Sequence, residues 1–80
     1  MVHDLKIQPE FFESVSLGIK TFEIRKLDRK YGFGDLLILH EWDGDYTGRY
    51  VEVRIVYMTT YKQQADYIVL GIEKVKKRGD

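Results

Sequence analysis

The strongest constraint on the fold is a pair of strand-like segments on either side of a tight-turn sequence. Asp35–Trp42 is the most apolar segment, and Arg49–Met58 alternates apolar residues with Glu52 and Arg54. The expected buried positions of the second segment are Val51, Val53, Ile55 and Tyr57. The alternation in Arg49–Met58 predicts a long strand with one buried and one solvated face, and the apolar Asp35–Trp42 predicts a strand with Leu37, Leu39 and Glu41 on one side and Leu36, Ile38 and His40 on the other. Because Asp43-Gly44-Asp45 between them is a hairpin-turn signal, the middle of the chain is expected to form a hairpin.

The rest of the chain predicts three more strands and one helix. The strand patterns are His3–Ile7, Lys20–Lys26 and Tyr67–Ile72. Pro9 suits the first turn of a helix over residues 9–17, and Gly18 suits its end. The side chains expected to share one face of that helix are Phe11, Phe12 and Val15. Residues 27–34 and 59–66 are expected to be loops, because they are rich in charged, polar or glycine residues.

Five strands and one early helix predict a mainly β fold with a short helix (α+β). The 80 residues fit one domain spanning 1–80, since domains usually hold about 50 to 250 residues. A mainly antiparallel sheet of this size should curl to hide its edges. The expected architecture is therefore a small β-barrel of about five strands with the helix packed beside it. Residues 73–80 are expected to be a basic tail that frays at its end.

Composition excludes several classes of protein. The chain has no cysteine, which rules out a disulfide scaffold, a thiolate zinc site and a cysteine nucleophile. Its longest apolar run is Leu36–Leu39, far below the roughly 20 residues that span a bilayer. The N-terminus also lacks the apolar core of a signal peptide, so we expect a cytoplasmic protein without membrane contact.

No metal or cofactor is expected. The two histidines, His3 and His40, lie on different predicted strands, whereas a metal site needs three or four converging ligands. His40, Glu41 and Asp43 are close in sequence but fall on alternating strand faces. The Asp43-Gly44-Asp45 segment lacks the remaining ligands of a calcium loop.

Charge limits how the chain could bind nucleic acid. Thirteen basic and thirteen acidic residues give a formal net charge of zero, so any such binding must come from a local patch. Residues 20–30 carry an excess of three positive charges, and the tail adds Lys74, Lys76, Lys77 and Arg78. If the two clusters are adjacent they form a basic surface, with Asp4, Glu41, Asp43 and Asp45 on the far side. An ordinary solvated surface is the alternative.

The segment Gly18–Arg25 is the most informative for chemistry. Strand alternation places Thr21, Glu23 and Arg25 on one face, opposite Phe22 and Ile24. Lys20 stands at the strand entry, where a turn can bring it to the same side. One interpretation is a solvent-exposed sheet face with a weak ion pair that stabilises the fold by about 0 to 1 kcal/mol. The other is a polar cleft in which Arg25 or Lys20 meets a phosphate and Glu23 accepts from a donor.

The same segment resembles a known family. Its Gly18, Lys20, Glu23 and Arg25 fit the G-x-K-x-x-E-x-R signature of the ASCH domain of the PUA-like superfamily, and Gly34-Asp35 fits the pair that often opens the following strand. The opening segments look like a compact bacterial and phage branch of uncertain function. The resemblance implies a PUA-like barrel whose cleft, lined by Lys20, Glu23 and Arg25, binds RNA or a modified nucleotide.

This hypothesis assigns a set of residues to nucleic-acid binding. They are Lys20, Glu23, Arg25, Arg29, His3, Lys6 and Tyr67. Unpaired bases stack on aromatic rings, so Tyr46 and Tyr61 are further candidates beside Tyr67. Each of these tyrosines has the alternative of being an ordinary surface residue.

Two other functions stay open. Some relatives of similar fold are amidohydrolases of acetylated cytidine, with a threonine nucleophile where this chain has Glu23. The catalytic candidates would then be Lys20, Thr21 and Glu23, with Thr21 activated by Lys20. The third possibility is a protein–protein interaction module, and the chain is expected to be a monomer or a weak dimer.

Overall fold

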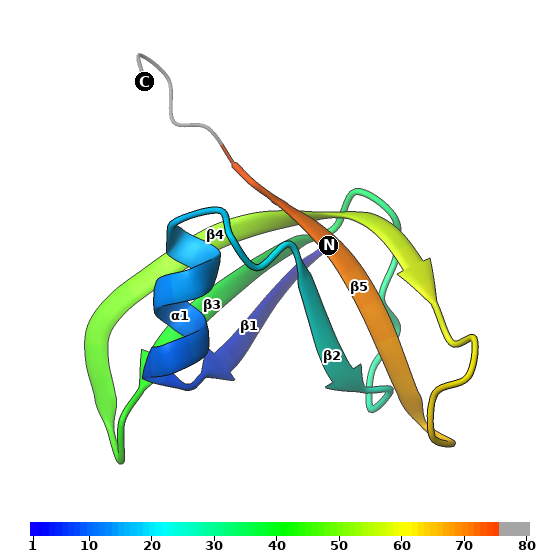
Figure 1. Ribbon diagram of the computed structural model, residues 1–80, viewed down its shortest axis with the longest axis horizontal. Coiled ribbons are helices and arrows are strands. Elements are labelled where there is room, and N and C mark those ends of the chain that lie inside the picture. Colours follow the sequence, from blue (N-terminus) through cyan, green and yellow to red (C-terminus); the bar gives the residue numbers. More distant parts are fainter. Residues whose placement is uncertain (76–80) are drawn as a thin grey trace.

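Residues 1–75, the part of the chain described by the computed structural model, form five strands and one helix (Figure 1). The elements in chain order are β1 (Val2–Ile7), α1 (Pro9–Ser16), β2 (Phe22–Lys26), β3 (Leu36–Trp42), β4 (Tyr46–Thr59) and β5 (Tyr67–Lys74). The strand order in the sheet is β1-β3-β4-β5-β2, with β1 parallel to β3 and the other pairs antiparallel. The predicted α+β class is confirmed.

The sheet curls into a half-barrel whose two edges are β1 and β2. Figure 1 shows this curl, with α1 on one side and the β2–β5 pair on the other. The edges come close enough for Arg25 Nη2 to donate a hydrogen bond of 2.9 Å to the main-chain carbonyl of Lys6. The long, strongly bent β4 allows this curl, because it pairs with β3 along its first half and with β5 along its second.

The core fills the concave side of the sheet and is covered by α1. Its members are Leu5, Ile7, Phe12, Val15, Tyr31, Leu37, Leu39, Val51, Val53, Ile55, Ile68, Leu70 and Ile72. Phe12 and Val15 are the buried residues of α1. The expectation that Phe11 shares their face was wrong, because Phe11 is 39% exposed. The helix ends where Gly18 takes a φ of +75°, a conformation that glycine adopts without steric cost.

The orientation of β2 is the reverse of the predicted one. Phe22 and Ile24 are exposed, whereas Glu23 is only 4% exposed. In the ladder with β5, Glu23 pairs with the fully buried Leu70, and directly opposed residues share a sheet face. Glu23 therefore lies on the concave face, among apolar core residues.

The start of β4 and the burial of Tyr57 also differ from those predicted. Tyr46–Gly48, expected before the strand, belong to β4 because Trp42 pairs with Tyr46 and the Thr47 hydroxyl donates to Glu41 Oε1 at 2.7 Å. A register shift between Ile55 and Tyr57 leaves Tyr57 exposed, where alternation predicted it buried.

The predicted basic tail is only partly described. Glu73 and Lys74 belong to β5, and Lys74 Nζ donates to the carbonyl of Ser16 at 2.7 Å. The remaining basic residues, Lys76, Lys77 and Arg78, lie outside the described residues.

The β4 bulge makes Gly71 a sensitive position. A Cβ atom added at Gly71 would lie 2.9 Å from Tyr57 Cβ, which is below the separation of ordinary contacts. We expect Gly71→Ala to lower the free energy of unfolding by about 1 to 3 kcal/mol through overpacking, measured by urea unfolding. A Cβ at Gly32 meets its nearest atom at 3.5 Å, so Gly32→Ala is the matched control and should stay within about 0.5 kcal/mol. Equal losses in both variants would contradict this reason.

Candidate functional site

Glu23 is a buried carboxylate held between two cations. Arg25 donates to its Oε2 atom from Nε at 2.9 Å and contacts the same oxygen from Nη2 at 2.8 Å. Lys20 Nζ donates to the other oxygen, Oε1. The side chains of Lys20 and Arg25 keep 17% and 20% exposure, against 5% for Glu23. The carboxylate therefore forms the floor of the cluster, and the two cations reach solvent.

The turn after α1 places Lys20 in this cluster. The amides of Ile19 and Lys20 both donate to the Ser14 carbonyl, at 2.9 and 3.0 Å. This turn directs the Lys20 side chain back along β2, where Nζ also donates to the Phe22 carbonyl at 2.8 Å. The ammonium lies 5.2 Å from the centre of the Phe11 ring and 4.9 Å from that of Phe22. The predicted approach of Lys20 to Glu23 and Arg25 is present in the structure.

A cleft follows the open side of the half-barrel, where the two sheet edges meet. One hollow of about 410 Å³ begins beside α1 and is lined by Lys6, Ile7, Gln8, Phe11, Lys20, Phe22, Glu23, Ile24 and Arg25. It carries three cations and one carboxylate, a local positive excess in a chain of zero net charge. The predicted trio of Lys20, Glu23 and Arg25 thus lines one concave site.

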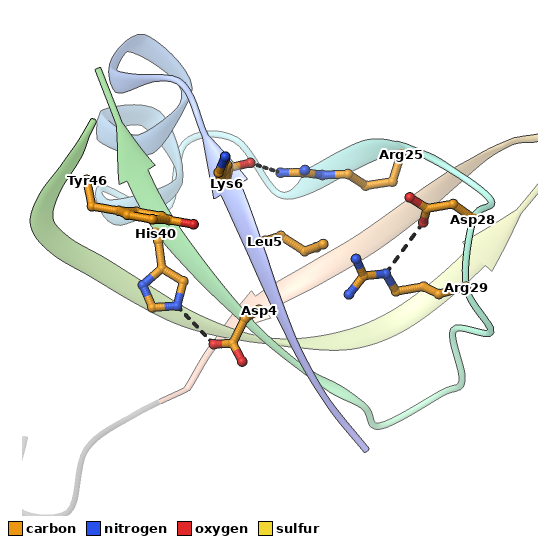
Figure 2. Close-up of a pocket in the computed structure, with 8 residues that line it drawn as sticks. All are labelled: Asp4, Leu5, Lys6, Arg25, Asp28, Arg29, His40 and Tyr46. Carbon is orange, nitrogen blue, oxygen red and sulfur yellow. Dashed lines mark hydrogen bonds and ion pairs between the residues drawn. The ribbon is translucent and has the colours of Figure 1, made fainter. Parts of the chain in front are cut away.

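A second hollow of about 560 Å³ lies on the other side of the Arg25–Lys6 bridge. Figure 2 shows its lining residues: Asp4, Leu5, Lys6, Arg25, Asp28, Arg29, His40 and Tyr46. Lys6 and Arg25 line both hollows, so the two hollows are neighbours, and together we call them the cleft. Arg29 and Tyr46, predicted from the sequence, belong to this part. Asp4 was expected on the far side, but it lines the cleft and accepts from the His40 ring at 2.9 Å.

His3 does not line either hollow. It is buried, its Nε2 atom lies 2.8 Å from Asp35 Oδ2, and its ring centre lies 4.9 Å from that of Tyr31. The hydrogen bond from His3 is the main reason that the pKa of Asp35 falls from 3.8 to about 2. Burial raises the pKa of the Tyr31 hydroxyl, and the Arg29 charge partly opposes that rise. This group of residues joins β1 to the start of β3.

The lowered pKa of Asp35 predicts an acid-dependent loss of stability. A carboxyl whose folded pKa is depressed stabilises the fold above its unfolded pKa, and that contribution disappears as pH falls towards the folded value. The free energy of unfolding should therefore drop as the pH falls from 3.8 to about 2. In urea unfolding at several pH values, Asp35→Asn should flatten this slope. Asp43→Asn removes an exposed carboxylate outside this network and should leave the slope in place; equal flattening in both variants would contradict the assignment.

The other predicted residues lie elsewhere. Thr21 lines a separate hollow of about 210 Å³ that it shares with Lys20 and Lys74, and its carbonyl accepts from the Ile72 amide. Tyr67 pairs with Lys26 at the β5–β2 edge. Tyr61 is 74% exposed in the loop before β5. None of these three residues lines the two hollows of the cleft.

Sequence reasoning missed the aromatic rim of the cleft. Phe11 was expected on the helix face of Phe12 and Val15, and Phe22 on the apolar face of its strand. The two rings are 39% and 45% exposed and line the hollow beside Lys20. The available signal was the helical position of Phe11, adjacent to Phe12 and so rotated away from it by about 100°. Within residues 1–75, no group of three or more His, Cys, Asp or Glu side chains is placed to hold a metal ion. No helix in that part of the chain is long and apolar enough to cross a membrane.

The fold is shared with a protein of known structure. The crystal structure of hypothetical protein PH0355 superposes with a TM-score of 0.69 at 15% sequence identity, covering 94% of this chain and 100% of that one. At this identity the likeness shows the fold alone.

Sequence comparison shows the family. Residues 2–72 match the family described as Domain of unknown function (DUF3850), and the chain belongs to that family. It is also 45% identical over 71 residues to "Uncharacterized 12.9 kDa protein in GpA 3′region" of Escherichia phage P2. That match covers 86% of this chain and 65% of the phage protein, so it spans slightly less than two thirds of the relative. The phage relative agrees with the expected bacterial and phage grouping.

Proposed function

We propose that this chain is an ASCH-type, PUA-like module that binds RNA or a modified nucleotide in the cleft beside α1. The observation that carries the proposal is the buried Glu23 carboxylate on the cleft floor, with Lys20 and Arg25 on either side. A buried ion cluster is weak evidence for stability, because desolvation offsets most of the attraction. Its position in a solvent-accessible hollow favours a role in recognition.

The chemistry of the cleft suits a nucleotide. Arginine presents a planar fork to phosphate, and lysine presents a compact charge. Within residues 1–75, Arg25 uses its Nε and Nη2 atoms for its contacts with Glu23 and the Lys6 carbonyl. Its Nη1 atom is left for a ligand. The Glu23 carboxylate can accept from an exocyclic amino group such as that of cytosine. Phe11 and Phe22 at the rim offer faces on which an unpaired base can stack.

Binding is favoured over acyl transfer by the contacts of Lys20. Its ammonium donates to Glu23 and to the Phe22 carbonyl, whereas Thr21 lines a different hollow from Glu23. Thr21 and Lys20 do share that smaller hollow, but the Lys20 ammonium donates to Glu23 and to the Phe22 carbonyl, so the geometry gives more support to binding than to a Thr21 nucleophile activated by Lys20. A nucleic-acid-binding role together with the absence of cysteine supports the proposal that the protein acts in the cytoplasm.

Fluorescence anisotropy with labelled single-stranded and structured RNA pools at low salt tests the proposal. We expect binding that weakens steeply between about 50 and 200 mM salt, because phosphate contacts release counterions. If the protein binds none of the RNA pools at low salt, the proposed function is wrong. In parallel, incubation with acetylated cytidine followed by chromatography should show no product; turnover that is lost in Lys20→Ala would establish the enzyme instead.

A further inference from the structure

A continuous row of aromatic rings lies on the convex face of the sheet, next to the cleft. Its members, in spatial order, are Tyr50, His40, Tyr46 and Trp42. The His40 ring centre lies 6.0 Å from those of both Tyr50 and Tyr46, and Tyr46 lies 4.8 Å from Trp42. Tyr46 and Tyr50 are 57% and 53% exposed. We call this set the aromatic row.

Strand pairing builds the aromatic row and connects it to the cleft. His40 pairs with Tyr50 of β4 on one side and with Lys6 of β1 on the other. Lys6 Nζ lies 3.8 Å from the centre of the Trp42 ring. Lys6, His40 and Tyr46 also line the larger hollow of the cleft, as Figure 2 shows. Lys6 therefore contacts the row through Trp42 and also lines both hollows.

The exposure of these rings on the outer face of the sheet favours a binding surface. The outer face of an antiparallel sheet is normally the polar one, and contiguous exposed apolar side chains on it mark binding surfaces. Within the row, the His40 ring is hydrogen-bonded to Asp4 Oδ1 at 2.9 Å. Tyrosine and tryptophan rings have few rotatable bonds, so they lose little conformational freedom when a flat partner stacks on them.

The charges beside the row favour one kind of partner. Lys6, Arg25 and Arg29 line the hollow that the row borders, and they exceed its two carboxylates, Asp4 and Asp28, by one charge. Aromatic rings beside a positively charged groove are the arrangement that binds single-stranded nucleic acid, because bases stack on the rings and phosphates meet the cations. A purely apolar protein partner would not use the cations.

We infer that the aromatic row is a second contact surface, on which unpaired bases stack when an RNA strand leaves the cleft past Lys6. This inference rests on the proposed function and extends it from one nucleotide to a strand. The cleft takes the recognised nucleotide, and the row adds affinity without reading sequence, since every base has a face that stacks.

The test compares a labelled oligouridylate of about ten nucleotides, within the usual site size of a small module, with labelled uridine monophosphate. Tyr50 belongs to the row and lines neither hollow of the cleft. Tyr50→Ala should therefore weaken binding of the oligonucleotide by about fivefold or more and leave the mononucleotide unchanged. Tyr50→Phe keeps the ring and should bind like the parent chain. Phe33→Ala removes a ring that is 68% exposed outside the row and is the matched control. Circular dichroism verifies that each variant is folded.

The outcomes separate this inference from the proposed function. If Tyr50→Ala leaves oligonucleotide affinity unchanged while Lys20→Ala lowers it, the inference about the row fails and the proposed binding in the cleft stands. If Tyr50→Ala lowers oligonucleotide affinity while Lys20→Ala leaves it unchanged, the row stands as a contact surface and the proposed binding in the cleft fails. If analytical ultracentrifugation shows self-association that Tyr50→Ala abolishes, with RNA affinity unchanged, the row is a protein interface and the inference fails.

Discussion

Replacing Glu23 with alanine should lower the free energy of unfolding by about 3 kcal/mol, the low end of the cost of removing one partner from a buried ion cluster. The change removes the carboxylate that pairs with both Lys20 and Arg25, so two neighbouring positive charges lose their shared counter-charge. The low end applies because each cation keeps about a fifth of its side-chain surface in solvent. Urea unfolding at neutral pH measures the effect.

Two further variants give this prediction a control and a contrast. Glu13→Ala removes an exposed carboxylate that pairs with Arg49 at 3.1 Å, and should cost no more than about 1 kcal/mol. The triple variant Lys20→Met/Glu23→Leu/Arg25→Met replaces the whole cluster by apolar groups. It should stay close to the parent chain in stability while losing RNA binding. A loss from Glu23→Ala as small as that from Glu13→Ala would contradict the account of the cluster.

Removing both cations of the cluster should have the largest effect on binding. Charged hydrogen bonds contribute about 1.5 to 3 kcal/mol each, so Lys20→Ala/Arg25→Ala should weaken RNA binding by about a hundredfold or more. For a single strand, each lost phosphate contact lowers the slope of log affinity against log salt by about 0.7. The slope should therefore fall by about 1.4. Anisotropy titrations over a series of salt concentrations give both quantities.

Nearby cations outside the cleft provide the matched control. Lys26 and Lys30 belong to the same basic stretch and are exposed, and neither lines the two hollows. Lys26→Ala/Lys30→Ala removes the same charge and should reduce affinity by only a few-fold, through long-range attraction. If this control loses as much affinity as the cleft variant, binding depends on general charge and not on the cleft.

Much of the fold follows from alternation and turn residues. Alternation of period two predicted β1, β2 and β4, short apolar runs predicted β3 and β5, and the Asp43–Asp45 turn joins β3 to β4 as predicted. Alternation shows which residues share a face but not which face is concave. For β2 the apolar face was taken as the buried one, whereas pairing of Glu23 with Leu70 places the polar face inside. That choice depends on long-range strand order, which the local pattern does not contain.

The candidate site was predictable where it is local. Lys20, Glu23 and Arg25 lie within six consecutive residues, so a turn followed by a strand is enough to bring them together. The Arg25 contact to the Lys6 carbonyl joins residues that are 19 apart and exists only because the sheet curls. For the same reason, the sequence did not show that Asp35 would hold His3 away from the cleft.

A titration of the ¹⁵N-labelled protein with the best-binding RNA, followed by amide chemical shifts, tests the central claim most directly. The account predicts that the largest shifts fall in residues 6–8, 20 and 22–25, which line the hollow beside α1. Amides around Arg54 and Glu73, which line a different hollow, should stay unchanged. Shifts centred on Arg54 and Glu73, with none in residues 20–25, would contradict it.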